Sequence, residues 1–180
     1  MPTIHGYVNT MRCACMDVDS YNCAGVYSAG DIDNGVFVTL GDINRNSTNF
    51  TVNGFEYNVT PATNAATRVW LVATPEVGSD ILMQELSDPR YFYNEAGRAM
   101  SLKYLVPGVD CIEVTKECFT DTTLPTNDNK YVTIGANGKL TASAADPAAG
   151  TNVYFTFVGY HNVTFGNEDV QTAIIRIERN

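Results

Sequence analysis

The sequence predicts an all-β protein, with a β-barrel or β-sandwich body, one short helix and an extended N-terminal arm. Short apolar runs, many of them alternating with polar residues, recur along the 180 residues. Turn-forming Gly, Pro, Asn and Asp separate these runs at intervals of about 8–12 residues, which is typical of a barrel or a sandwich. Helical spacing of apolar residues is clear in one segment only, so strands are expected to supply nearly all of the core.

The first 30 residues differ from the rest in pattern. The stretch "MDVDSYNCAGVYSAGD" (16–31) follows neither a strand nor a helix period and is rich in small and polar residues. Such a segment buries too little apolar surface to order itself. We therefore predict that residues 1–30 form an extended arm that orders on a partner. Residues 31–180 then form a β-rich body, either as one unit or as two lobes with a seam near Pro107.

The body is predicted to begin with strands. In "DIDNGVFVTLG" (31–41), Asp, Asn and Gly form a turn ahead of an apolar run that suits a strand. Asn53-Gly54, the strongest short hairpin signal, lies between alternating apolar positions in 50–60. The run 67–74 is apolar almost throughout, which predicts a central strand.

The short helix is predicted in "SDILMQELSD" (79–88). Ser79 can cap its start, apolar residues share one face, and Pro89 follows its end. Strands resume after it, with a turn at Pro107-Gly108 and a hairpin around Asn137-Gly138. The strands expected in this half of the chain lie in 98–106, 111–119, 130–143, 152–165 and 172–180.

Charge excludes some classes of partner. The chain has 11 basic and 20 acidic residues, a net charge of −9, whereas a nucleic-acid surface needs a basic stripe. We expect no nucleic-acid and no membrane partner, and an acidic surface that provides solubility or meets a positive patch. No run approaches the roughly 20 apolar residues of a membrane span, and the start lacks the apolar stretch of a signal peptide. Synthesis and retention in a cytoplasm are therefore expected.

Candidate catalytic residues are few. The two histidines, His5 and His161, lie far apart, and the common motifs of hydrolases, metalloproteases and phosphate-binding loops are absent. Cys111 or Cys118 would have to pair with His161 as a nucleophile, but both cysteines lie in strand-like runs that favour buried structural thiols. His161 is expected to hydrogen-bond at a strand end. We predict that the chain is not an enzyme and holds no cofactor.

Two further kinds of site are alternatives. A glycosidase would need two facing carboxylates, and Glu56, Glu113 and Glu117 all lie in predicted strands. Aromatic side chains at strand alternation could form a sugar-stacking platform, although such residues more often form the core. The aromatic residues concerned are Trp70, Tyr91, Phe92, Tyr93, Tyr154, Phe155 and Phe157.

Metal-binding patterns are incomplete. Cys13-x-Cys15 with Cys23 and His5 has poor spacing for zinc, and the odd total of five cysteines points to reduced thiols. Asp17-x-Asp19 and Asp31-x-Asp33 resemble fragments of calcium loops, but the second lacks a closing Glu. A hard cation near Asp31 and Asp33 stays an alternative to a simple turn.

Five segments form an ordered series of turns and strands: "DNGVFVTLG", followed in the second half by "AGRAMSLKYLVPGVDCIEVTKECF", "KYVTIGANGKLTA", "VYFTFVGY" and "TAIIRIE". Their order resembles a family of capsid decoration proteins of tailed bacteriophages. One departure is Gly108-Val109-Asp110, where the family has Gly-Asp. The matching positions are Asp33, Asn34, Gly35, Val38, Leu40, Gly41, Gly97, Leu102, Leu105, Gly108, Asp110, Ile112, Val114, Thr115, Phe119, Tyr131, Val132, Asn137, Gly138, Leu140 and Arg176.

The resemblance implies a structural virion protein that binds the exterior of an assembled capsid and stabilises it. Its partners would be the major capsid protein and further copies of itself, as a homotrimer or another homo-oligomer. The alternatives are another virion module, of the tail or a head fibre, and a carbohydrate-binding β-sandwich. We predict that apolar and aromatic residues of the arm contact the capsid, namely Ile4, Tyr7, Val8, Met11, Tyr21 and Tyr27.

Overall fold

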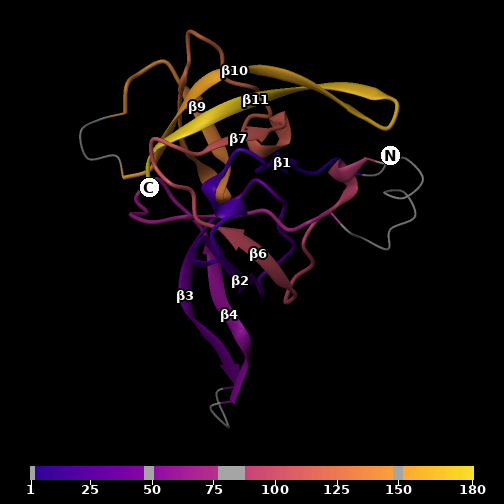
Figure 1. Cartoon of the computed structure of the whole chain (residues 1–180), viewed down its shortest axis with the longest axis vertical. Helices are drawn as coiled ribbons and strands as arrows, with labels where there is room; N and C mark the ends of the chain where they lie inside the picture. The colour runs from indigo at the N-terminus through magenta and orange to yellow at the C-terminus, as the bar shows by residue number, and fades with distance from the viewer. Residues whose placement is uncertain (1–2, 47–50, 77–87, 148–151) are drawn as a thin grey trace.

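The fold is all-β, as predicted, and consists of a closed five-stranded barrel and a six-stranded sheet (Figure 1). The computed structural model describes residues 3–46, 51–76, 88–147 and 152–180. The barrel forms the lower part of the molecule in Figure 1, and the sheet lies above it.

The barrel is built from the first half of the chain. Its strand order is β2-β4-β3-β5-β6, in which β2 and β4 run parallel and the other pairs of neighbours run antiparallel. Closure leaves no free edge around the barrel itself. The strands are β2 (Asn22–Val26), β3 (Phe37–Asn46), β4 (Thr51–Pro61), β5 (Trp70–Val72) and β6 (Ala99–Lys103).

The second sheet contains the rest of the chain and one N-terminal strand. Its order is β1-β7-β11-β10-β8-β9, with every pair of neighbours antiparallel. The change from barrel to sheet falls between β6 and β7, and Pro107 lies in that interval. The strands are β1 (Val8–Asn9), β7 (Cys111–Val114), β8 (Tyr131–Ile134), β9 (Leu140–Ser143), β10 (Tyr154–Phe165) and β11 (Glu168–Arg179).

Helical structure in the described residues consists of 3₁₀ turns. The predicted helix over 79–88 lies outside the described residues except for Asp88, which caps η3 by accepting a hydrogen bond from Arg90 N at 2.9 Å. The turns are η1 (Ala14–Met16), η2 (Asp19–Tyr21), η3 (Pro89–Tyr91), η4 (Lys116–Cys118) and η5 (Ala136–Gly138).

Strand alternation divides the core into two clusters. On β3, Val38 points into the barrel, where it packs with Val72 and Leu102. The preceding residue, Phe37, points the other way and meets Phe155 of the sheet at 5.1 Å between ring centroids. Because successive side chains of a strand face opposite sides, the same strands fill the barrel and form one wall of the interface with the sheet.

The prediction of a separate arm over residues 1–30 is wrong. Val8 of β1 pairs with Val114 of β7, and β2 closes the barrel between β4 and β6. Between these two strands, Ala14 N donates a hydrogen bond of 2.7 Å to the buried carboxylate of Asp110. The segment lacks a period because it contributes short pieces to two sheets, so its order comes from distant parts of the same chain.

The two predicted Asn-Gly hairpins have opposite outcomes. Asn137-Gly138 does connect β8 to β9, with φ of 54° and 73°, the left-handed values that Asn and Gly tolerate best. Asn53-Gly54 lies inside β4 instead, and the hairpin is formed by β3 and β4 as whole strands. The signal at Asn53 marks an irregularity in a strand rather than its end.

Candidate functional site

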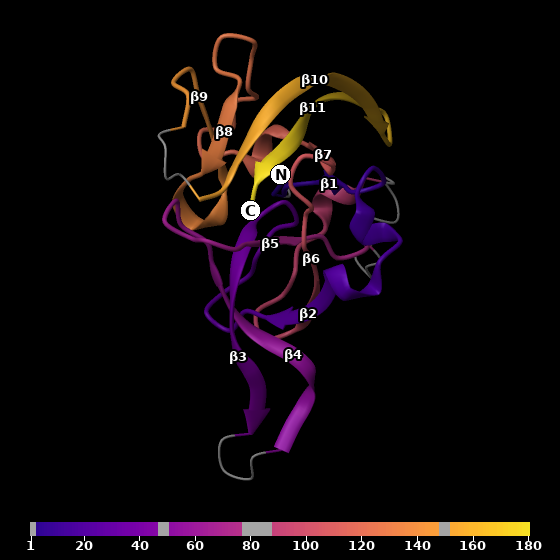
Figure 2. The same cartoon turned by 60° about the vertical axis from the view of Figure 1, so that its left-hand side comes forward.

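The β3–β4 hairpin projects from the barrel, away from the sheet (Figure 2). Glu56 of β4 still pairs with Ala24 of β2, at one end of the parallel ladder. Beyond it the two strands continue as a two-stranded ribbon, with Arg45 opposite Val52. A ribbon of this kind has two free edges and little core of its own, so it is well shaped for contact with another molecule.

A bulge in this ribbon lies next to an exposed aromatic side chain. Ile43 pairs with Tyr57 and Arg45 pairs with Val52, so Asn44 alone faces residues 53–56. Extra residues in one strand break the alternation and redirect side chains. Phe55 is 89% exposed and Ile43 is 39% exposed. We refer to Ile43 and Phe55 as the ribbon patch, and it is the candidate contact surface.

The other long hairpin, β10–β11, also extends beyond its sheet, but its tip is tied to the rest of the protein. Arg90 of η3 is 3% exposed and binds Asp88 at 2.7 Å and Glu168, at the start of β11, at 2.6 Å. The hydrogen bonds from Arg90 to Asp88 raise the pKa of the guanidinium further above its ordinary value. Phe165 packs edge-on against Tyr7, and Arg90 lies over its ring.

Most of the predicted capsid-contact residues do not form an open surface. Val8 is buried in the main core, which rules it out as a contact. Tyr7, Tyr21 and Tyr27 are half-buried against neighbours within the fold. Ile4 and Met11 are exposed. The error follows from treating 1–30 as an arm, since strand pairing turns its apolar residues inward.

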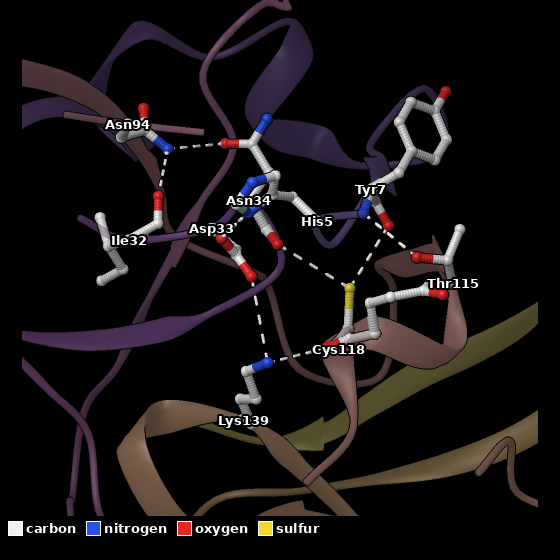
Figure 3. A network of polar contacts seen from close by, with 10 residues as sticks. His5, Tyr7, Ile32, Asp33, Asn34, Asn94, Thr115, Cys118 and Lys139 are labelled. Carbon is white, nitrogen blue, oxygen red and sulfur yellow. Dashed lines mark hydrogen bonds and ion pairs between the residues drawn. The ribbon is translucent and has the colours of Figure 1, made fainter. Parts of the chain in front are cut away.

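A polar network joins the N-terminal segment to the barrel and to the sheet (Figure 3). His5 Nδ1 lies 2.7 Å from Asp33 Oδ1, and Lys139 Nζ lies 3.9 Å from Asp33 Oδ2. Asn94 Nδ2 donates to Asn34 Oδ1 at 3.2 Å. These contacts connect segments far apart in the sequence, so the network stabilises the junction between the two sheets.

Cys118 lies within this junction as a buried thiol. The backbone carbonyl oxygens of Tyr7, at 3.4 Å, and Asn34, at 3.8 Å, lie within reach of its Sγ, whose single S–H donates to one of them at a time. Burial raises the pKa of this thiol to about 12, so it stays protonated. Gly35 has φ of 84°, and a Cβ there would collide with Cys118 Sγ. The Asn-Gly of the "DNG" motif is thus explained by packing.

The predicted metal alternatives are not assembled. Within the described ranges, no three His, Cys, Asp or Glu side chains come together in a way that could hold an ion. Asp31 accepts a hydrogen bond from Ala96 N at 2.9 Å, while Asp33 binds His5 and Lys139. Of the zinc candidates, Cys13 and Cys15 lie within hydrogen-bond distance of each other, but Cys23 lies on β2 and His5 binds Asp33.

The predicted catalytic alternatives are partly brought together. Cys111, Glu113 and His161 line one surface pocket of about 310 Å³, whereas Cys118 lies elsewhere in the junction. His161 Nδ1 donates to Glu113 Oε1 at 2.7 Å from within β10, rather than at a strand end as predicted. The glycosidase set is divided, because Glu56 lies on β4 of the barrel, Glu113 on β7 and Glu117 in η4.

Comparisons with known proteins give no family. No protein-family model matches the chain, and neither a curated protein nor a solved structure is significantly similar to it. No helix in the described part of the chain is long and apolar enough to cross a membrane. The candidate site therefore has to be judged on its own geometry.

Sequence reasoning missed the ribbon patch. Phe55 follows Asn53-Gly54 directly, so reading that dipeptide as a turn placed Phe55 at the start of a return strand. The signal that could have found it is the same dipeptide, because Gly within a strand often marks a bulge.

Proposed function

We propose that this chain is a capsid decoration protein of a tailed bacteriophage, which binds the exterior of the assembled shell through the β3–β4 ribbon. The observation that carries the proposal is the ribbon patch, in which Phe55 is almost fully exposed on a projecting hairpin and Ile43 is partly exposed at its base. Aromatic anchors that enter a pocket on a partner contribute much of the binding free energy of protein interfaces. The motif order described above supports the choice of a phage capsid as that partner.

The geometry suits a component that is present in many copies. Burial of a phenylalanine side chain contributes about 1.5–3 kcal/mol, which gives only weak binding to a single site. On a shell, copies linked as a homo-oligomer would bind several sites at once, so modest affinity at each site is sufficient. We propose a homotrimer or another homo-oligomer that connects neighbouring subunits of the major capsid protein.

Charge supports a protein partner with a basic patch. The net charge of −9 would repel nucleic acid and anionic lipid, and it would speed association with a positive surface. The partner proposed is therefore the major capsid protein on the outside of the virion, with no contact to the packaged DNA.

The test is reconstitution on capsid shells that were assembled without this protein, from the virus whose genome encodes it. Purified protein is mixed with the shells and binding is measured by co-sedimentation. Saturable binding and greater resistance of the shells to heat are expected. Absence of binding would overturn the proposal, and density on the tail in electron micrographs of virions would replace the capsid by another virion module.

A matched pair of variants tests the ribbon. Phe55→Ser should reduce the affinity for shells at least about tenfold, because it removes the exposed anchor. Val109→Ser is the control, since Val109 is also exposed, at 65%, but lies in the turn between β6 and β7. Equal binding by Phe55→Ser and the wild type would show that the ribbon is not the contact.

A further inference from the structure

A pocket on the outer face of the six-stranded sheet is independent of the ribbon. Its walls come from β7, β10 and β11 and from the N-terminal segment just after β1. The volume of about 310 Å³ is at the lower end of small-molecule sites, which start at about 300 Å³. Ile174 and Met11 give it apolar walls, while Arg12 and His161 add polar groups.

One carboxylate in the pocket, that of Glu113, already accepts three hydrogen bonds from the protein. Glu113 Oε1 accepts from His161 Nδ1 at 2.7 Å and from Thr172 Oγ1 at 2.5 Å, and Glu113 Oε2 accepts from Asn9 Nδ2 at 3.3 Å. The carboxylate therefore acts as an orienting group. Since Nδ1 donates to it, the neutral imidazole presents Nε2 as an acceptor.

The same pocket contains a guanidinium, that of Arg12. In the parts of the chain that the structure describes, no carboxylate forms an ion pair with Arg12. By contrast, Arg176, which pairs across the sheet with Cys111, is held by Glu178 at 2.8 Å. Arg12 is thus the cationic group of this pocket that is available to bind an anion.

The thiol in the pocket is suited to binding rather than to attack. Burial raises the pKa of Cys111, although the guanidiniums of Arg176 and Arg12 oppose the shift. A protonated thiol is a poor nucleophile and a weak hydrogen-bond donor. The pocket therefore combines a cation, an oriented acceptor and apolar walls, without an activated nucleophile.

We propose that this pocket binds a small hydroxycarboxylate. The carboxylate of the ligand pairs with the guanidinium of Arg12, its hydroxyl donates to Nε2 of His161, and its carbon body packs against Ile174 and Met11. Arg recognises carboxylates through two parallel hydrogen bonds, which gives direction as well as charge. The ligand is given a hydroxyl because, with Nδ1 donating to Glu113, the neutral imidazole has Nε2 left as its acceptor.

The test is an NMR titration of the full chain with 3-hydroxybutyrate and, as a larger probe, mandelate. We expect saturable shifts of the His161 ring and Ile174 methyl signals at millimolar concentrations. Butyrate and phenylacetate, which lack the hydroxyl, and the amides of both hydroxy acids should bind at least about tenfold more weakly, because each leaves one polar group of the site unpaired.

Variants show whether the site is the one assigned. Arg12→Gln should abolish the shifts without changing the melting temperature, since Arg12 is exposed. Arg98→Gln is the control, because Arg98 is an exposed arginine that pairs with Glu95 on the barrel side. The proposal is overturned if neither hydroxy acid saturates, if inorganic phosphate or butyrate binds equally well, or if Arg12→Gln still binds.

Discussion

The two long hairpins of the molecule differ in what happens beyond their sheets. In β10–β11, the tip is held by Arg90, which binds Glu168, and by Phe165, which is 6% exposed. In β3–β4, the aromatic residue beyond the barrel, Phe55, is 89% exposed. Two hairpins of similar length, which extend in different directions in Figure 1, therefore differ in that one buries its aromatic residue and the other exposes it.

The difference separates a residue that serves the fold from one that is available for binding. Burial of Phe165 contributes to folding in the isolated chain. Exposure of Phe55 contributes nothing until another surface covers it. The comparison predicts that substitutions around the tip of β10–β11 act on stability, and that substitutions in the β3–β4 ribbon act on association.

The largest effect is expected from Arg90→Met. It leaves the buried carboxylate of Asp88 without its partner, and breaking a buried ion pair in this way costs about 3–5 kcal/mol of unfolding free energy. Urea denaturation, followed by the fluorescence of Trp70, measures the loss. The exposed Arg98→Met serves as the control, and equal stabilities for the two variants would contradict the role assigned to Arg90.

Phe165→Ala should be next. It removes a buried ring that contacts Tyr7 at 4.8 Å between centroids, and such truncations cost about 3–5 kcal/mol. Limited proteolysis should also cleave the β10–β11 hairpin faster in this variant. If stability falls without faster cleavage there, the ring supports the core but does not fasten the tip.

Glu168→Gln should have a small effect. Its side chain is 63% exposed, so its ion pair with Arg90 is screened by water and contributes about 1 kcal/mol or less. Denaturation in low and in high salt tests this, because the difference from the wild type should shrink as salt rises. A loss as large as that of Arg90→Met would show that Glu168, rather than Asp88, is the main partner.

The smallest effect on stability is expected from Phe55→Ser. An exposed side chain away from special features usually changes the unfolding free energy by about 0.5 kcal/mol or less. The same denaturation measurement checks this. A loss of unfolding free energy comparable to that of Phe165→Ala would contradict the contrast between the two hairpins, because Phe55 would then stabilise the fold.

Local patterns predicted the strands well and their partners poorly. The alternation that placed strands at 98–106 and 130–143 is a property of neighbouring residues, and it survived in β6, β8 and β9. The pairing of Val8 with Val114 depends on residues a hundred positions apart, so the pattern of 1–30 gave no hint of it. The arm prediction failed for that reason.

For the candidate sites, as for the strands, the sequence identified residue types but not which residues lie together. Cys111 and His161 were recognised as reactive types, but only the strand order, with β11 between β7 and β10, shows that they share a pocket. The aromatic residues weighed for sugar stacking include Phe155, which is fully buried in the core, as strand alternation had favoured. Phe55 was missed because Asn53-Gly54 was interpreted as a turn, whereas it lies inside β4.

The union of β1 with β7 has a consequence for how the chain folds. The strand that contains Val8 has no partner until it pairs with Val114 of β7, far along the chain. Strand β7 in turn pairs with β11 near the other end of the chain. Closing such long loops costs chain entropy before any contact is gained, which slows folding to about the millisecond-to-second range for β-proteins of this kind. Refolding should therefore be sluggish, and dilute conditions should favour it by keeping unpaired edges of different molecules apart.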